Sequence, residues 1–230
     1  MIRALSFDLD GTLVDTAGEI AEAVNRTLVE FDIAPRPQAE ITGLIGNGLR
    51  ELMMRLLARI LLEQPDLADR VNVEQVLARV GEQYAACVGT SAQAYPGAVS
   101  ALRALRQAGL HTACVTNKDG AYTHKLLVAT GLHELLDLVI AGDTLAQRKP
   151  HASVLRSAAA SLKVDTDALV HVGDSRTDIE AARNAGVAAW AVPYGYNGGE
   201  PVALSRPDRL FDTLTDVACH ALGLQPARAA

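Results

Sequence analysis

Short apolar runs recur along the chain, and most of them stop abruptly at polar or turn-forming residues. Each run has the length of a strand and is almost continuously hydrophobic, as strands covered on both faces are. Five runs are therefore predicted as strands: 3–7, 112–115, 138–141, 168–172 and 187–192. Between them, apolar positions recur at helical spacing, and several of these segments stop just before a glycine. These segments predict helices over residues 98–107, 120–129, 153–162 and 177–184.

This alternation of strands and helices predicts an α/β fold, with a Rossmann-like parallel sheet flanked by helices. In such sheets, sites form at the carboxyl ends of the strands. One insertion interrupts this alternation of strands and helices. It has no clear strand, and its apolar positions recur at helical spacing over residues 17–31, 49–62 and 73–87. It is far longer than the ~2–6 residues of an ordinary strand-to-helix connection. We therefore expect an all-helical cap at 15–94, inserted into a discontinuous core of residues 1–14 and 95–225.

Composition and charge exclude several classes of protein. The 230 residues are 49% hydrophobic and 21% charged, which is typical of a folded globular chain. A net charge of −6 argues against nucleic-acid binding. No apolar stretch reaches the ~20 residues that a membrane span needs. Three distant cysteines without a CxxC pair predict a reducing compartment, the cytoplasm. The pattern leaves both a monomer and a homodimer open.

Carboxylates follow two of the predicted strands. Asp8 and Asp10 lie two positions apart in the stretch DLDGT, directly after the first strand. Two anions this close repel each other unless a cation or a proton holds them, and Mg²⁺ prefers such oxygen ligands. The alternative is a tight turn, because Asp-Gly is a common turn pair. Asp174 and Ser175 follow another strand, where either residue would cap the next helix, or Asp174 would hold the same metal as Asp8.

Other polar residues at loops suit a phosphate group. Thr116 and Asn117 end a predicted strand, where a hydroxyl and backbone N–H groups would bind phosphate oxygens or simply begin a helix. Lys149, fixed by a following proline, would neutralise a phosphoryl group, although most lysines are only solvated. In the insertion, Asn47 either caps a helix or belongs to a specificity loop, in which Arg50 is a candidate for a substrate carboxylate.

Along the chain these motifs read DLDGT, VTN, RKP and GDSRTD, each at a predicted strand end or loop. Their order and spacing resemble the haloacid dehalogenase superfamily of phosphohydrolases over essentially the whole chain. The helical insertion directly after the first motif is similar to the first type of cap in that superfamily. Within the superfamily, four stretches resemble the bacterial phosphoglycolate phosphatases: FDLDGTLVDT, GLIGNGLRELM, YPGAVSALRALRQAGL and GDSRTDIEAARNAGV.

The resemblance implies a Mg²⁺-dependent phosphomonoester hydrolase that acts through an aspartyl-phosphate. The expected substrate is 2-phosphoglycolate, a small-molecule phosphate ester. Asp8 would be the nucleophile, and Asp10 would be the general acid and then the base. The metal would be held by Asp8, the main-chain carbonyl of Asp10, and Asp174. The phosphate oxygens would be bound by Thr116, the Asn117 amide and Lys149.

Two more residues are implied to support these groups. Asp178 would orient Lys149 or a water at the metal, and Ser175 would lie behind the ligands. The second aspartate of the first motif favours a phosphoester, because dehalogenases of the superfamily release a halide and lack it. The alternatives are another small substrate (a sugar phosphate, a nucleotide or pyrophosphate), a phosphomutase on the same fold, and a binding protein without catalysis.

Overall fold

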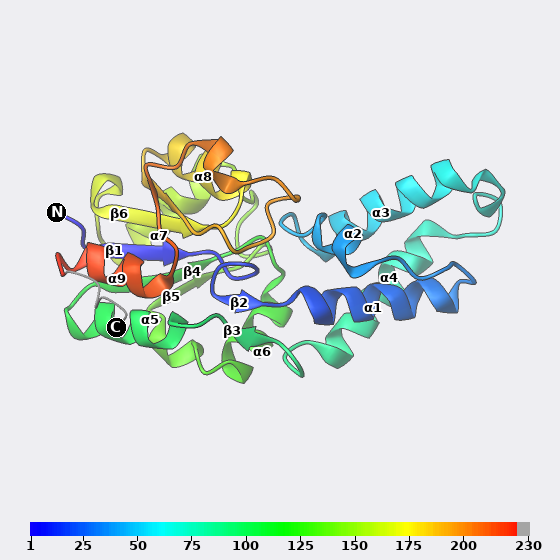
Figure 1. Ribbon diagram of the computed structural model, residues 1–230, viewed down its shortest axis with the longest axis horizontal. Coiled ribbons are helices and arrows are strands. Elements are labelled where there is room, and N and C mark those ends of the chain that lie inside the picture. The colour runs from blue at the N-terminus through cyan, green and yellow to red at the C-terminus, as the bar shows by residue number, and fades with distance from the viewer. Residues whose placement is uncertain (225–230) are drawn as a thin grey trace.

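The computed structural model describes residues 1–224, so residue 225, where the predicted core segment ends, lies outside the described part. Six strands form one parallel sheet in the order β5-β4-β1-β6-β7-β8 (Figure 1). They are β1 (Ala4–Phe7), β4 (His111–Val115), β5 (Leu138–Ile140), β6 (Leu169–Gly173), β7 (Ala188–Ala191) and β8 (Arg209–Leu210). The strand β1 occupies the centre, because β4 and β6 pair with it on either side. The predicted α/β fold is confirmed.

Helices cover both faces of this sheet. They are α5 (Ala98–Gln107), α6 (Gly120–Ala129), α7 (Ala152–Leu162), α8 (Arg176–Ala185) and α9 (Leu214–Ala221), with the short 3-10 helices η2 (His133–Leu135), η3 (Thr166–Ala168) and η4 (Val202–Ser205). Successive strand residues point to opposite faces. Leu5 and Phe7 therefore pack in the cluster that includes α5 and α9, whereas Ala4 and Ala113 pack in the cluster of α7 and α8. This double coverage explains why the strands read as continuous apolar runs.

The insertion folds as helices beside the carboxyl end of the sheet (Figure 1). It contains α1 (Ala17–Glu30), α2 (Gln38–Thr42), α3 (Leu49–Glu63), η1 (Pro65–Leu67) and α4 (Val73–Cys87). These helices pack through buried apolar side chains that include Val24, Leu28, Leu56, Ile60, Val76 and Val80. An antiparallel pair of short strands, β2 (Val14–Asp15) and β3 (Gln93–Ala94), joins the insertion to the core. The proposed domain boundaries fall at this ribbon.

The predicted strands and helices are all present, and their ends shift by at most one residue. The sequence did not predict β2, β3 or β8, which have two residues each, nor the helices α2 and α9. The two-residue strands and the five-residue α2 carry too few residues to show a hydrophobic period. The pairing of β2 with β3 depends on segments almost eighty positions apart, as in the register Asp15 with Gln93.

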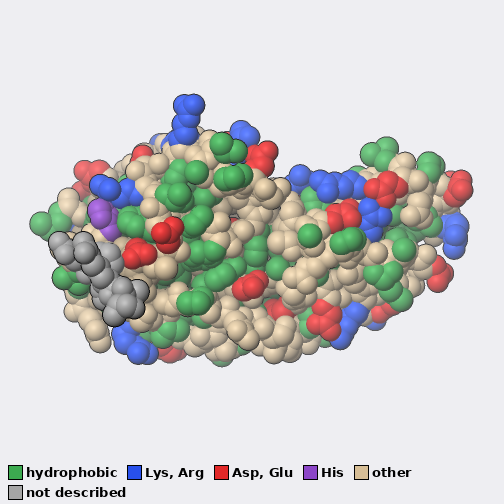
Figure 2. Space-filling model, in the orientation of Figure 1, with side chains coloured by type: hydrophobic (Ala, Val, Ile, Leu, Met, Phe, Trp, Pro, Cys, Tyr) green, Lys and Arg blue, Asp and Glu red, His purple; other side chains and the backbone are tan. Residues whose placement is uncertain are grey.

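The surface agrees with an ordinary globular protein. On the face shown in Figure 2, Lys and Arg side chains lie among Asp and Glu side chains, and the surface is hollowed between the core and the cap. A groove there is lined by residues of α2 and of the loop after β7, including Thr42 and Tyr196. Among residues 1–224, no helix combines the length and the apolar character that crossing a membrane would require. The cysteines at positions 87, 114 and 219 are free thiols.

Candidate active site

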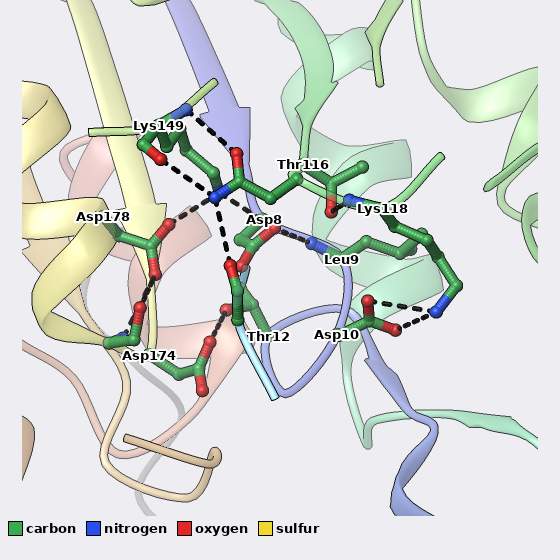
Figure 3. Close-up of polar contacts among 12 residues, drawn as sticks. Asp8, Leu9, Asp10, Thr12, Thr116, Lys118, Lys149, Asp174 and Asp178 are labelled. Carbon is green, nitrogen blue, oxygen red and sulfur yellow. Dashed lines mark hydrogen bonds and ion pairs between the residues drawn. The ribbon is translucent and has the colours of Figure 1, made fainter. Parts of the chain in front are cut away.

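The predicted core residues gather where the sheet meets the cap (Figure 3). Asp8 directly follows β1, Thr116 follows β4, and Asp174 follows β6. Lys149 lies in the loop before α7, and Asp178 lies in the first turn of α8. All five side chains are buried. Parallel strands bring their carboxyl ends to one edge, so residues more than a hundred positions apart become neighbours.

The two carboxylate oxygens of Asp8 differ, because one contacts donors and the other has no hydrogen-bond partner among the described residues. Its Oδ1 accepts hydrogen bonds from the Leu9 backbone N–H at 2.7 Å and from the Lys149 ammonium at 2.9 Å. No residue of the described part hydrogen-bonds its Oδ2. Burial raises the pKa of Asp8 to about 6; the charges of Asp178 and Asp10 add to this, and Lys149 only partly opposes it. A carboxylate with one fixed and one open oxygen can act as a nucleophile.

Lys149 is held by a buried network of opposite charge. Its Nζ lies 2.7 Å from Asp178 Oδ1. Asp178 Oδ2 accepts hydrogen bonds from the Ser175 backbone N–H at 3.1 Å and from the Ser175 hydroxyl at 2.7 Å. The ring of His171 lies 3.2 Å from Asp178 Oδ1. Burial lowers the pKa of Lys149, but the charges of Asp178 and Asp8 outweigh it, so the pKa lies above its ordinary value.

The structure therefore brings Lys149, Asp178 and Ser175 together, as the resemblance implied. Burial alone would raise the pKa of Asp178, but the charge of Lys149 and the hydrogen bond from His171 hold it below its usual range. Asp178 is thus a fixed anion whose position determines where the ammonium lies. The supporting roles of Asp178 and Ser175 remain predictions. The sequence did not single out His171, because a histidine inside an apolar strand has no motif of its own.

Asp174 lies in a tight space made by small neighbours. Its Oδ1 accepts a hydrogen bond from the Thr12 hydroxyl at 2.9 Å, and its Oδ2 accepts one from the Tyr196 backbone N–H at 2.6 Å. A Cβ at Gly11 would lie 2.5 Å from Asp174 Oδ2, and one at Gly195 would lie 2.1 Å from it. Gly11 also has a φ of +84°, which favours glycine. Both positions must lack a side chain for Asp174 to keep its place.

The acidic residues of this edge fit a divalent cation. Carboxylate oxygens of Asp8, Asp174 and Asp178 lie within 4.8 Å of one another. Burial raises the pKa of Asp174, and the charges of Asp178 and Asp8 add to this. The ammonium of Lys149 is shared by Asp8 and Asp178, so it offsets only one of these three negative charges. A hard ion such as Mg²⁺ prefers carboxylate oxygens, and Asp8 and Asp174 would hold it. The Asp10 carbonyl as a third ligand stays a prediction.

Asp10 points to the other side of the cavity, toward a residue that the sequence did not single out. Lys118 Nζ lies 2.9 Å from Asp10 Oδ1 and 3.1 Å from Oδ2. The Thr16 hydroxyl donates a hydrogen bond of 2.7 Å to the same carboxylate. Lys118 directly follows the Thr116-Asn117 pair, so its place at a strand end was the available signal. Its pairing with Asp10 could not be read from the sequence.

Thr116 and Asn117 lie beside Asp8 but use their side chains in different ways. The Thr116 hydroxyl accepts a hydrogen bond from the Lys118 backbone N–H at 3.2 Å. The Asn117 side chain binds the backbone of Lys149 on both sides, accepting from its N–H at 2.9 Å and donating to its carbonyl at 3.0 Å. The same amide donates to the Gly46 carbonyl of the cap at 3.0 Å. Asn117 therefore has only its backbone N–H left for a phosphate oxygen.

A cavity lies between the two halves of the site. The core side of its lining contains Asp8, Asp10, Thr116, Asn117, Lys118 and Asp119. The cap side, together with Tyr122 of α6, is mainly apolar: Ile20, Ile45, Gly46, Gly48, Leu49, Leu52 and Tyr84.

The two predicted specificity residues of the cap do not line this cavity. Asn47 and Arg50 border a separate opening beside Arg148. The Arg50 guanidinium lies 2.9 Å from Glu74 Oε1, and its side chain is 59% exposed. The alternative that Asn47 caps α3 is wrong, because Gly48 occupies that position at a φ of 89° without a side-chain bond. The role of Asn47 and Arg50 in specificity stays a prediction.

Comparisons with known proteins agree with this geometry. A family model described as haloacid dehalogenase-like hydrolase matches residues 5–192. The chain is 43% identical to "phosphoglycolate phosphatase, plasmid" of Cupriavidus necator, over 99% of this chain and 95% of that protein. It is 38% identical to a phosphoglycolate phosphatase of Thiobacillus denitrificans, over 94% of each chain.

The fold is also similar to that of a solved structure described as a phosphatase. The fold matches a crystal structure of a predicted phosphoglycolate phosphatase from Haemophilus somnus, with a TM-score of 0.86 and 29% sequence identity. The match covers 94% of this chain and 96% of that one. The chain therefore belongs to the haloacid dehalogenase-like hydrolase family. Within that family it is a phosphatase, and the resemblance noted in the sequence is confirmed.

Proposed function

We propose that this protein hydrolyses 2-phosphoglycolate to glycolate and inorganic phosphate, with Mg²⁺, through an aspartyl-phosphate on Asp8. The observation that carries the proposal is the position of Asp8, which lines the cavity while its Oδ1 pairs with the buried ammonium of Lys149 and its Oδ2 has no hydrogen-bond partner among the described residues. The names of the two curated relatives support the choice of substrate.

The reaction would proceed in two displacements. Asp8 Oδ2 attacks phosphorus, the bond between phosphorus and the ester oxygen breaks, and Asp10 gives a proton to the departing glycolate oxygen. Asp10 then takes a proton from a water molecule, whose oxygen attacks phosphorus, and the bond between phosphorus and Asp8 Oδ2 breaks to release inorganic phosphate. This second step returns Asp8 as a carboxylate and Asp10 as a carboxylic acid. Asp10 fits the role because it lines the same cavity as Asp8.

Lys149 would hold the phosphoryl oxygens on which negative charge gathers. Its ammonium is fixed by Asp178 at 2.7 Å, so it is already in position before the substrate arrives. Thr116 and Asn117 line the cavity, and the hydroxyl of the first and the backbone N–H of the second would bind a further oxygen. When bound by Asp8 and Asp174, Mg²⁺ supplies positive charge that offsets the repulsion between the carboxylates and a phosphate dianion.

The protein's partner in this proposal is a small-molecule ester rather than a macromolecule. The free thiols of Cys87, Cys114 and Cys219 support a reducing compartment, and we place the protein in the cytoplasm.

A substrate panel tests the proposal. Phosphate release would be measured with Mg²⁺ from 2-phosphoglycolate, sugar phosphates, nucleotides and pyrophosphate. We expect 2-phosphoglycolate to have the highest kcat/KM, and EDTA to abolish the activity. Asp8→Asn removes the nucleophile and is expected to lower kcat by at least about 10⁴-fold. The exposed Asp69→Asn is the matched control.

Each result of the panel has a definite meaning. A higher kcat/KM for another ester would overturn the substrate while leaving the chemistry. Turnover that needs a phosphosugar primer would indicate a phosphomutase. Undiminished activity of Asp8→Asn would overturn the aspartyl-phosphate.

A further inference from the structure

The proposed substrate carries a second anion, and the cavity must accommodate it. The leaving group of 2-phosphoglycolate ends in a carboxylate, which is costly to bury without a cation or hydrogen-bond donors. Among residues 1–224, Lys118 is the only cationic side chain that lines the cavity. Arg50 pairs with Glu74 at the surface, and Arg148 pairs with Asp119. Lys118 is therefore the candidate cation for the substrate carboxylate.

Lys118 has hydrogen-bonding capacity to spare. Its side chain is 6% exposed, and its Nζ lies 2.9 Å and 3.1 Å from the two oxygens of Asp10. An ammonium has three N–H groups, and the two oxygens of one carboxylate engage two of them, which leaves the third for the neighbouring Tyr84 or for a ligand. The Nζ also lies 4.7 Å from the centre of the Tyr84 ring. The ammonium is thus held between the proposed general acid and an aromatic residue of the cap.

Tyr84 provides an independent observation that points to a ligand. The residue is 1% exposed, and its hydroxyl is the only buried side-chain polar atom of the described residues without a hydrogen-bond partner. Buried polar groups nearly always have partners, so an unpaired one needs an explanation. The neighbouring Tyr122 differs, because its hydroxyl donates to the Gly81 carbonyl at 3.0 Å. Tyr84 comes from α4 of the cap and lines the same cavity as Lys118.

We propose that Lys118 and Tyr84 form the subsite for the substrate carboxylate, an inference that rests on the proposed function. The Lys118 ammonium and the Tyr84 hydroxyl each donate a hydrogen bond to this group. Because the same ammonium contacts Asp10, binding the carboxylate also places the ester oxygen beside Asp10. Because Lys118 belongs to the core and Tyr84 to the cap, an acidic leaving group joins the two halves and a neutral one does not.

The test compares two substrates that differ in this one group. We would measure kcat/KM for 2-phosphoglycolate and for 2-hydroxyethyl phosphate in the wild type, Lys118→Met and Tyr84→Phe. Lys118→Met will slow both reactions, because it also removes a contact of Asp10, so the ratio of the two values is the readout. Losing a charged donor should lower the ratio about 30-fold, and losing the hydroxyl should lower it about 5-fold. Tyr122→Phe is the matched control and should leave the ratio unchanged.

A binding measurement separates recognition from catalysis. In the Asp8→Asn background, calorimetry would give the Kd of both esters with and without Lys118→Met. We expect the substitution to weaken the binding of 2-phosphoglycolate far more than the binding of 2-hydroxyethyl phosphate. Circular dichroism and the Tm check folding. Tyr84→Phe removes an unpaired buried oxygen and should leave the Tm unchanged. If Lys118→Met does not fold, the ratio of the two kcat/KM values in Tyr84→Phe decides whether the subsite exists.

The possible failures are distinguishable. If the wild type does not prefer 2-phosphoglycolate over 2-hydroxyethyl phosphate, the proposed substrate is wrong. If the wild type shows the preference and both variants keep it, the proposed function stands and the subsite is overturned. Lys118→Met could instead lower kcat/KM for both substrates by the same factor and weaken the binding of both equally. Lys118 would then act only through Asp10, and the subsite would be overturned as well.

Discussion

The two halves of the cavity are lined by different kinds of residue, charged on the core side and mainly apolar on the cap side. On the core half, buried charges contact one another directly: Asp8, Lys149 and Asp178 lie within 2.9 Å of a partner of opposite sign. On the cap half, the lining is apolar apart from tyrosine. In the proposed function, the core half would stabilise charge on a phosphoryl group. The cap half would exclude water and distinguish leaving groups.

This difference predicts different responses to substitution. In the core, each buried ion depends on a partner, and removing one partner leaves an uncompensated charge. In the cap, no such network lines the cavity, and the position of the whole helical unit matters more. One buried carboxylate, Glu19 of α1, connects the cap to its return segment by accepting hydrogen bonds from three backbone N–H groups. Four experiments sharpen the contrast.

The largest effect is expected at Lys149. Lys149→Met removes the cation shared by Asp8 and Asp178, so kcat should fall at least about 10³-fold. The free energy of unfolding should fall by about 4 kcal/mol, because two buried carboxylates lose their partner. Phosphate release and urea unfolding measure the two effects. The exposed Lys163→Met is the control.

A double variant separates charge from chemistry at this position. Lys149→Met with Asp178→Asn removes both ions, so the protein should regain most of the lost stability while remaining inactive. A double variant no more stable than Lys149→Met would show that the pair does not carry the energy assigned to it.

The second effect concerns the attachment of the cap. Glu19 is 1% exposed and accepts from the backbone N–H groups of Gly89, Ser91 and Ala92 at 2.9 to 3.1 Å. Glu19→Ala should lower the free energy of unfolding by about 4 kcal/mol, since charged hydrogen bonds contribute ~1.5–3 kcal/mol each. Hydrogen exchange should accelerate first at residues 88–92. Glu22→Ala, on the same helix but exposed, should have little effect, and equal losses in the two variants would contradict the role of Glu19.

The third effect is a dependence of stability on pH and Mg²⁺. The pKa of Asp8 rises from 3.8 to about 6 in the fold. Between these values the folded protein keeps a proton that the unfolded chain has released, so stability falls as pH rises. For Asp8 the loss reaches up to about 3 kcal/mol, and the raised pKa of Asp174 acts in the same direction. The lowered pKa of Asp178 acts only in more acidic solution.

Unfolding in urea between pH 4 and pH 7 would measure this loss, with EDTA and with Mg²⁺. We expect the decline in EDTA and its disappearance with Mg²⁺, because the cation stabilises the ionised carboxylates. Asp174→Asn should reduce the difference between the two conditions. Identical pH profiles with and without Mg²⁺ would contradict the assignment of Asp8 and Asp174 as ligands.

The smallest effect is expected at Arg50. Its ion pair with Glu74 is largely exposed, and such pairs contribute little to stability. Arg50→Ala should change kcat/KM for 2-phosphoglycolate less than about threefold and the free energy of unfolding by less than about 0.5 kcal/mol. Glu74→Ala should behave alike. A tenfold loss of kcat/KM in Arg50→Ala alone would move the carboxylate subsite from Lys118 to Arg50.

The amino-acid sequence alone predicted the parallel sheet, the positions of five of its six strands and the inserted helices. It did so because buried strands need continuous apolar runs and amphipathic helices need a period of 3.6 residues, both of which are local patterns. It also indicated which residues come to the carboxyl edge, since Asp8, Thr116 and Asp174 each directly follow a predicted strand.

The contacts between side chains at the site could be known only from the folded structure. Lys118 and Lys149 are both lysines in loops, yet one contacts Asp10 and the other contacts Asp8 and Asp178. Arg50 precedes the buried stripe of α3 by only two positions but faces Glu74 at the surface. Such pairings join residues far apart in the sequence, and they depend on how the strands and helices of each half pack together. No local pattern encodes that packing, because it brings together elements from distant segments.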